Sequence, residues 1–84
     1  MKEVTFVYNI KAPKPITEKE QDEIRDILEF LFKTSEFKIA GEILDFKVEA
    51  KQLTIAVIAA AYDMLVFEDT FAEQFPDFEL IQAI

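Results

Sequence analysis

The side chains in this sequence that could act chemically on another molecule are almost all carboxylates. The 84 residues include 17 Asp and Glu, nine Lys and Arg, no His, no Cys and no Trp. Without histidine or cysteine there is no imidazole base, no thiol nucleophile, and no nitrogen or sulfur ligand for a metal. Paired carboxylates can serve as general acid and base, but such a pair needs a cleft, and a chain this short offers little of one.

Phosphate and calcium motifs are also missing from the sequence. The chain has a single glycine, Gly41, so it has no glycine-rich loop that could hold a phosphate group. No run of acids has EF-hand spacing with the central glycine that this motif requires. We therefore predict that the protein is not an enzyme and that it has no catalytic, cofactor-binding or metal-binding residues. The alternative is a carboxylate-only site for Ca²⁺ or Mg²⁺.

The basic residues stop at Lys51. From Gln52 to Ile84 there is no Lys or Arg, so about −6 of the net charge of −8 falls in the last third of the chain. An uncompensated acidic surface repels nucleic acid and anionic membranes and attracts basic proteins. The sequence thus predicts, as partner, a basic protein surface such as that of a nucleic-acid-binding protein, without direct binding of nucleic acid or membrane. The acids concerned are Asp63, Glu68, Asp69, Glu73, Asp77 and Glu79.

No segment has the pattern of a signal peptide or a membrane span. The first residues, 1–5, are too polar for a signal peptide. The longest apolar run, residues 55–62, is far shorter than the roughly 20 residues that a membrane helix needs. We expect a cytoplasmic protein and one compact domain over residues 1–84.

The elements that must position the acids begin with a strand and a helix. Residues 3–11 alternate, with Val4, Phe6, Tyr8 and Ile10 on the predicted core face. The segment Ala-Pro-Lys-Pro ends this strand, because proline cannot donate to a strand ladder. Thr17 and Glu20 have capping-box spacing and predict a helix start. The core stripe of this helix is Ile24, Ile27, Leu28 and Leu31.

Two strands joined by a turn follow the first helix. Residues 43–50 and 53–61 are predicted strands, and a turn over residues 49–52 pairs Val48 with Leu53, Phe46 with Ile55 and Leu44 with Val57. The apolar positions are odd-numbered at Phe37 and Ile39 but even-numbered from Leu44. We therefore expect a bulge or bend at Gly41.

A second helix and a short strand complete the chain. Asp63 is the predicted N-cap, Met64, Phe67, Phe71 and Phe75 form the apolar stripe, and Pro76 ends the helix. Phe78, Leu80 and Ile84 predict a last strand. The order of elements, β-α-β-β-α-β, predicts an α+β fold of the ferredoxin-like type. In this fold two helices lie on one face of a four-stranded antiparallel sheet. The alternative is one long helix over residues 59–75, because Ala59 to Ala61 favour helix.

Two groups of helix residues are candidates for binding a partner. On the first helix, Glu18, Asp22, Asp26 and Glu29 share the polar face; the alternative is a solvated face, with Arg25 and Lys19 offsetting the charge. On the second helix, Asp69 and Glu73 have no neighbouring base, and Leu65 and Val66 point away from the core stripe beside them. The alternative for Leu65 and Val66 is packing under a loop.

The open face of the sheet is predicted to be mildly apolar. It carries no aromatic residue of the kind that RNA-recognition domains use for base stacking. A contiguous apolar patch often marks an interface, so a homodimer through this face is the second functional hypothesis. The residues are Val7, Ala56, Ile58 and Ile81, with Ala60 and Ala83 beside them. The leading hypothesis is a small acidic, non-enzymatic protein-binding module, such as an inhibitor that docks on a basic, nucleic-acid-binding surface. The second is a homodimeric structural or regulatory module.

Overall fold

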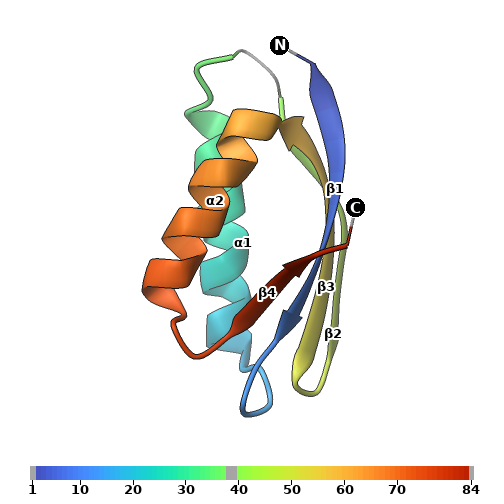
Figure 1. Ribbon diagram of the computed structural model, residues 1–84, viewed down its shortest axis with the longest axis vertical. Coiled ribbons are helices and arrows are strands. Elements are labelled where there is room, and N and C mark those ends of the chain that lie inside the picture. Colours follow the sequence, from blue (N-terminus) through green and yellow to red (C-terminus); the bar gives the residue numbers. More distant parts are fainter. Residues whose placement is uncertain (1, 38–39, 84) are drawn as a thin grey trace.

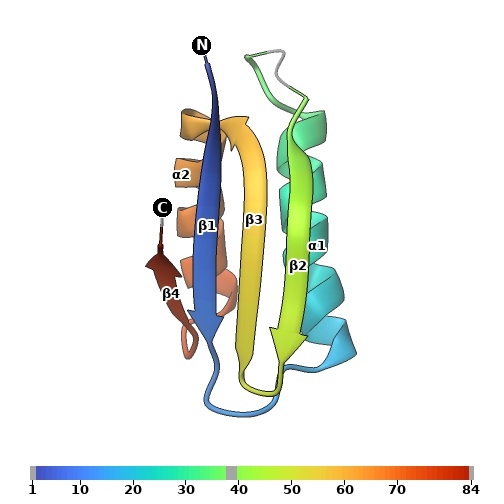
Figure 2. The same ribbon diagram turned by 90° about the vertical axis from the view of Figure 1, so that its right-hand side faces the viewer.

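The computed structural model describes residues 2–37 and 40–83 and has six elements. The strands are β1 (Glu3–Lys11), β2 (Glu42–Glu49), β3 (Gln52–Ala60) and β4 (Glu79–Gln82), and the helices are α1 (Glu18–Lys33) and α2 (Ala61–Gln74). Both helices cover one face of the sheet (Figure 1). The strands lie in the order β2-β3-β1-β4, and all neighbouring pairs are antiparallel (Figure 2). The predicted α+β fold with a four-stranded antiparallel sheet and two helices is thereby confirmed.

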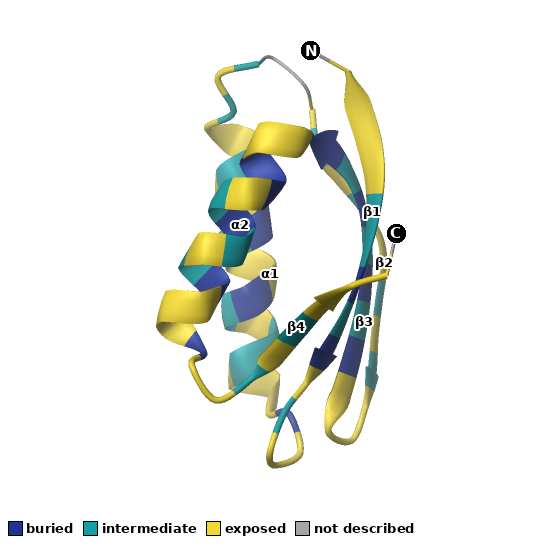
Figure 3. Ribbon diagram, viewed as in Figure 1, coloured by how far each residue is buried: buried dark blue, intermediate teal, exposed yellow. Residues whose placement is uncertain are grey.

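The core lies between the helices and the inner face of the sheet (Figure 3). Tyr8 and Ile10 of β1 are fully buried, as alternation predicts, and so are Leu53, Ile55 and Val57 of β3. On the helices the buried residues include the predicted Ile24 and Leu28 of α1 and Met64, Phe67 and Phe71 of α2. Val4 was predicted to be core but is 41% exposed, because it lies near the start of β1, beyond the stretch that β4 pairs with.

The start of α1 has the predicted capping box. The Glu20 amide donates to the Thr17 hydroxyl at 3.1 Å, and the Thr17 amide donates to the Glu20 carboxylate at 2.9 Å. Each bond satisfies an amide that the first turn of a helix leaves without a backbone partner. The proline-containing loop before α1 is held by Ala12 and Ile16, whose amides donate to the carbonyls of Lys51 and Ala50 in the β2–β3 turn.

The start of α2 differs from the prediction. Ala60, the last residue of β3, is the N-cap, and its side chain makes no capping hydrogen bond. Asp63 therefore lies in the first turn of α2, where it is buried, and the prediction of Asp63 as the N-cap was wrong. The alternative of one helix over residues 59–75 is also wrong, because β1 pairs with β3 as far as Ala60. The hydrogen bonds of this pairing keep Ala59 and Ala60 in the strand, although alanine favours helix.

The β2–β3 hairpin follows the predicted register only near its turn. Val48 pairs with Leu53 and Phe46 with Ile55, as predicted, but Val57 pairs with Ile43 instead of Leu44. The register shifts between Ile43 and Asp45, so the bulge lies beyond Gly41 and leaves Leu44 52% exposed.

Gly41 is needed for a different reason. A Cβ at this position would overlap the ring of Phe32 from the end of α1, so glycine permits a close approach between helix and strand. Ile39, part of the parity argument, lies outside the described residues.

The last strand is shorter than its pairing partner. β4 pairs only with Tyr8 to Lys11 of β1, and Leu80 is its half-buried residue. Phe78 precedes β4 and packs against Phe71 and Phe75, with ring centroids 6.1 and 5.0 Å away. The predicted strand residue Ile84 lies outside the part of the chain that the structure describes.

Candidate functional site

The acidic residues are concentrated on the helical layer. α1 has six acids and three bases, and α2 has four acids and no base, so the two helices together carry −7 of the net charge of −8. The rest of the chain has seven acids and six bases, which leaves it at −1. The negative charge is therefore concentrated on the helices. This concentration, −7 of −8, is stronger than the concentration of about −6 of −8 in the last third of the sequence.

Three of the four candidate residues of α2 lie on its outward surface. Leu65 is 59% exposed, and Asp69 and Glu73 are exposed in the same row, at spacings of four residues. Val66 is half-buried at the side of α2 that faces α1. We call these four residues, Leu65, Val66, Asp69 and Glu73, the α2 patch. Leu65 is thus not packed under a loop, and Val66 is partly covered by the neighbouring helix.

The candidate acids of α1 are all exposed, but they do not form one surface with the α2 patch. Glu18, Asp22 and Glu29 are spaced to share one side of α1 with Arg25. The Arg25 guanidinium lies 4.3 Å from the centroid of the Phe46 ring on β2, so this side of α1 faces the β2 edge of the molecule. Asp26 is the one predicted α1 acid that lines the boundary with α2.

Among the described residues, the bases of α1 form no strong ion pair with its candidate acids. Arg25, expected to offset the charge of this face, packs over the Phe46 ring. Lys19 lies 3.9 Å from Glu23, but the Lys19 side chain is largely exposed and that of Glu23 partly so, and such surface pairs contribute little to stability. The net charge of −7 on the two helices already includes these bases.

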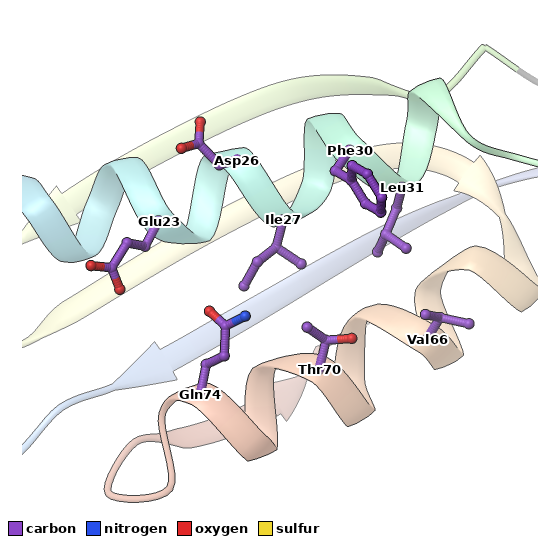
Figure 4. Close-up of a pocket in the computed structure, with 8 residues that line it drawn as sticks. All are labelled: Glu23, Asp26, Ile27, Phe30, Leu31, Val66, Thr70 and Gln74. Atoms are coloured by element: carbon purple, nitrogen blue, oxygen red, sulfur yellow. The ribbon is translucent and has the colours of Figure 1, made fainter.

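A groove of about 490 Å³ runs between α1 and α2 on the outer side of the helical layer. Figure 4 shows Ile27 and Leu31 reaching from α1 toward α2, and Thr70 and Gln74 reaching from α2 toward α1. The apolar part of the lining is Ile27, Phe30, Leu31 and Val66, and the acids are Glu23 and Asp26. The groove is thus an apolar channel with carboxylates on its α1 side.

Phe30 and Glu23 are groove residues that the sequence prediction missed. Phe30 is 65% exposed, more than any other large apolar side chain described. The signal was available in the spacing, because Glu23, Ile27 and Phe30 are four and three residues apart and therefore adjacent on one side of a helix. Which side would face a second helix could not be read from that spacing.

The open face of the sheet brings only part of the predicted dimer surface together. Val7 of β1 lies directly opposite Ala56 of β3, and Ile58 is the next outward residue of β3. Ile81 is 38% exposed and pairs with Asn9, so a polar residue separates it from the others. Ala60, expected on this face, is buried where the chain turns from β3 into α2.

Two carboxylates are engaged with the core instead of the surface. The Tyr8 hydroxyl donates to the Glu68 carboxylate at 2.8 Å, and burial, this hydrogen bond and the negative charge of Glu68 raise the pKa of Tyr8 well above its ordinary value. Asp63 is 6% exposed, and its Oδ2 accepts no hydrogen bond within the described residues.

The described residues include no group of three or more acids that could hold a metal ion. Within the same part of the chain, none of the helices has the length and apolar character required to cross a bilayer. Comparisons with protein-family models, with curated proteins and with solved structures find no match for the chain.

Proposed function

We propose that the protein is a non-enzymatic binding module that docks its acidic helical layer on a basic surface of another protein and thereby blocks that surface. The observation that carries this proposal is the placement of −7 of the net charge of −8 on the two helices. A basic surface that normally binds nucleic acid has the charge to match. The proposal includes no direct contact of the protein with nucleic acid or membrane.

The uneven charge gives the molecule an electrostatic orientation. The helical layer is strongly negative, whereas the remainder is close to neutral, so a basic partner is attracted to one side. Such a field accelerates encounter and selects the face that docks, and both effects weaken as salt is added. In the α2 patch, the exposed Leu65 beside Asp69 and Glu73 supplies apolar area that persists at higher salt.

A charge-reversal experiment tests the proposal. The protein is immobilised and incubated with an extract of the cells that it comes from in ~50 mM NaCl, and bound proteins are released with ~500 mM NaCl, where the Debye length is only a few ångströms. Wild-type protein is expected to retain a defined basic protein, and Asp69→Lys with Glu73→Lys is expected to lose it. The matched control is Glu42→Lys with Asp45→Lys, which changes the charge equally at exposed positions of β2.

The comparison between the two double variants decides the result. Retention by the β2 variant and loss by the α2 variant is the expected outcome. Equal loss by both would show that only total charge matters, and equal retention would show that the α2 acids are not used. Urea unfolding of each variant confirms that the fold is intact.

A second function, self-association through the open sheet face, is favoured by the contact of Val7 with Ala56 and the neighbouring Ile58. These residues form an apolar strip across the two central strands, and small domains gain stability from additional burial. A homodimeric structural or regulatory module would use this strip as its interface.

Light scattering tests the dimer. At ~100 μM, a concentration matched to an association free energy of about 5.5 kcal/mol, a dimer is expected that Ile58→Lys converts to monomer. Leu65→Lys, which places the same charge on an exposed apolar position of α2, should leave the dimer intact. A wild-type monomer at this concentration would contradict the dimer hypothesis.

Two finer assignments belong to the same proposal. We place the chain in the ferredoxin-like topology class, on the support of its element order and its antiparallel strand order. We also place the protein in the cytoplasm, where its basic partner would be found; fluorescence microscopy of a tagged chain tests that location.

A further inference from the structure

We propose that the groove between α1 and α2 binds a cationic amphipathic helix of the partner protein. This inference rests on the proposed function and adds to it the binding position and the secondary structure of the segment that is recognised. The groove, of about 490 Å³, lies on the most acidic part of the molecule and is open on the outer side of the helical layer (Figure 4).

The apolar lining supplies the contact for one face of such a helix. Ile27 and Leu31 line one wall and Val66 lines the other, and all three are only partly buried. Phe30 stands at the edge with 65% of its surface exposed. Covering these side chains would remove apolar surface from water that the isolated chain leaves accessible.

The length of the groove fits a short helix. Its lining extends from Glu23 to Leu31 on α1 and from Val66 to Gln74 on α2. Each of these stretches covers eight steps along its helix, or about 12 Å at 1.5 Å per residue. Apolar residues at positions i, i+3 or i+4, and i+7 of a bound helix span about the same distance, so two or three anchors can lie in the groove together.

Charge complementarity selects the flanks of that helix. Glu23 and Asp26 lie on the α1 side of the groove, and Asp69 and Glu73 are exposed next to Thr70 and Gln74 on the α2 side. A helix that inserts apolar residues between α1 and α2 therefore has carboxylates on both sides. Lys or Arg flanking the apolar stripe satisfies this arrangement, whereas an acidic helix or a second copy of this chain does not.

A labelled peptide provides the probe. The first peptide has 15 residues of Leu and Lys, with Leu at helical spacing; the second has the same composition with Leu and Lys alternating, which favours a strand pattern. Fluorescence anisotropy at ~50 mM NaCl gives the dissociation constant of each, and circular dichroism reports helix formation on binding. We expect the helical peptide to bind at least tenfold more tightly, a difference of about 1.4 kcal/mol.

Groove variants locate the site. Thr70→Trp fills the groove and is expected to weaken binding of the helical peptide about tenfold, which corresponds to about 1.4 kcal/mol. Ala72→Trp is the matched control, because this residue is exposed on α2 and does not line the groove, so binding should change less than twofold. Phe30→Ala, which removes an exposed side chain, is a second groove variant that decides the result if Thr70→Trp does not fold.

The outcomes separate this inference from the proposed function. If both peptides bind equally, and binding is lost in Asp69→Lys with Glu73→Lys, acidic docking stands and the groove inference fails. If Thr70→Trp and Phe30→Ala both bind the helical peptide like wild type, the groove is likewise not the site. If neither peptide binds wild-type protein, the groove inference fails whatever the extract experiment gives.

Discussion

The hydrogen bond between Tyr8 and Glu68 joins β1 to α2 at the level of single residues. Tyr8 is fully buried, and its hydroxyl reaches the Glu68 carboxylate at 2.8 Å. The Tyr8 ring also lies at an edge-to-face angle to Phe67, with centroids 5.7 Å apart. Glu68, one of the acids that follow the last basic residue Lys51, thus accepts the hydrogen bond of a buried hydroxyl. Its side chain is less exposed than those of Asp69 and Glu73.

Stability is expected to fall at alkaline pH because of Tyr8. An unfolded chain releases the phenol proton near its ordinary pKa of 10.0, whereas burial holds the proton to higher pH in the folded state. Above about pH 10 the folded state therefore binds more protons than the unfolded state, and stability decreases with rising pH by up to about 1.4 kcal/mol per unit. Urea unfolding at pH 9, 10 and 11 measures this slope.

The second tyrosine provides the control for this prediction. Tyr8→Phe should remove the alkaline loss and lower stability at pH 7 by about 1 kcal/mol, because a hydrogen bond to a partly exposed carboxylate is lost. Tyr62→Phe should keep the wild-type pH dependence, since Tyr62 is 53% exposed. An identical pH profile for wild type and Tyr8→Phe would refute the role of Tyr8.

At the scale of elements, the β2–β3 turn carries backbone strain. Glu49 pairs with Gln52, so the loop has two residues, and Ala50 has a φ of 52°, the only positive φ among the described residues other than glycine. Two-residue hairpins with a positive φ at the first position usually have glycine there. The turn also accepts hydrogen bonds from Ala12 and Ile16, so its conformation is fixed by the loop that precedes α1.

Ala50→Gly is therefore expected to stabilise the protein. Relief of the left-handed conformation outweighs the added chain entropy of glycine, for a net gain of about 0.5–1 kcal/mol. Lys51→Gly, the control at the other turn position, should instead lower stability by about the same amount, because its φ is not positive. Urea midpoints compare the variants, and a loss of stability in Ala50→Gly would contradict the strain argument.

At the scale of the whole molecule, repulsion between the acids of the two helices lowers the stability of the folded state. The helices hold ten acids and three bases side by side, and Asp69 and Glu73 are like charges one turn apart. Repulsion of this kind favours a partner that brings opposite charge, which is why the same layer is the proposed docking surface. Stability and binding should consequently respond to salt in opposite directions.

The melting temperature is expected to rise with added NaCl. Between ~20 and ~500 mM the Debye length shrinks from about 20 Å to about 4 Å, which screens repulsion between the helices. For a domain of this size each kcal/mol gained corresponds to about 4–8 °C. Asp69→Asn with Glu73→Gln should melt higher than wild type at low salt and gain less from NaCl. A wild-type melting temperature that falls or stays constant with NaCl would contradict this expectation.

Most of the fold could be predicted from periodic patterns in the sequence. Alternation in β3 and in the second half of β1, the 3.6-residue period of both helices and the Thr17–Glu20 capping box are local, and each appears in the structure as predicted. The incorrect predictions concern places where two elements meet. The bulge lies between Ile43 and Asp45, whereas Gly41 accommodates the ring of Phe32. α2 begins at Ala61 because β1 extends the pairing of β3 to Ala60.

The sequence by itself determined the excess of acids and the absence of bases after Lys51, because both follow from composition alone. It also determined which helix faces are apolar, since helical spacing is a local property. Only the tertiary structure decided which acids lie together. Packing of α1 against α2 and of Arg25 on Phe46 separates Glu18, Asp22 and Glu29 from the α2 patch, and it places Phe30 at a groove with Val66. Those contacts depend on the relative rotation of elements far apart in the chain, and no local pattern fixes that rotation.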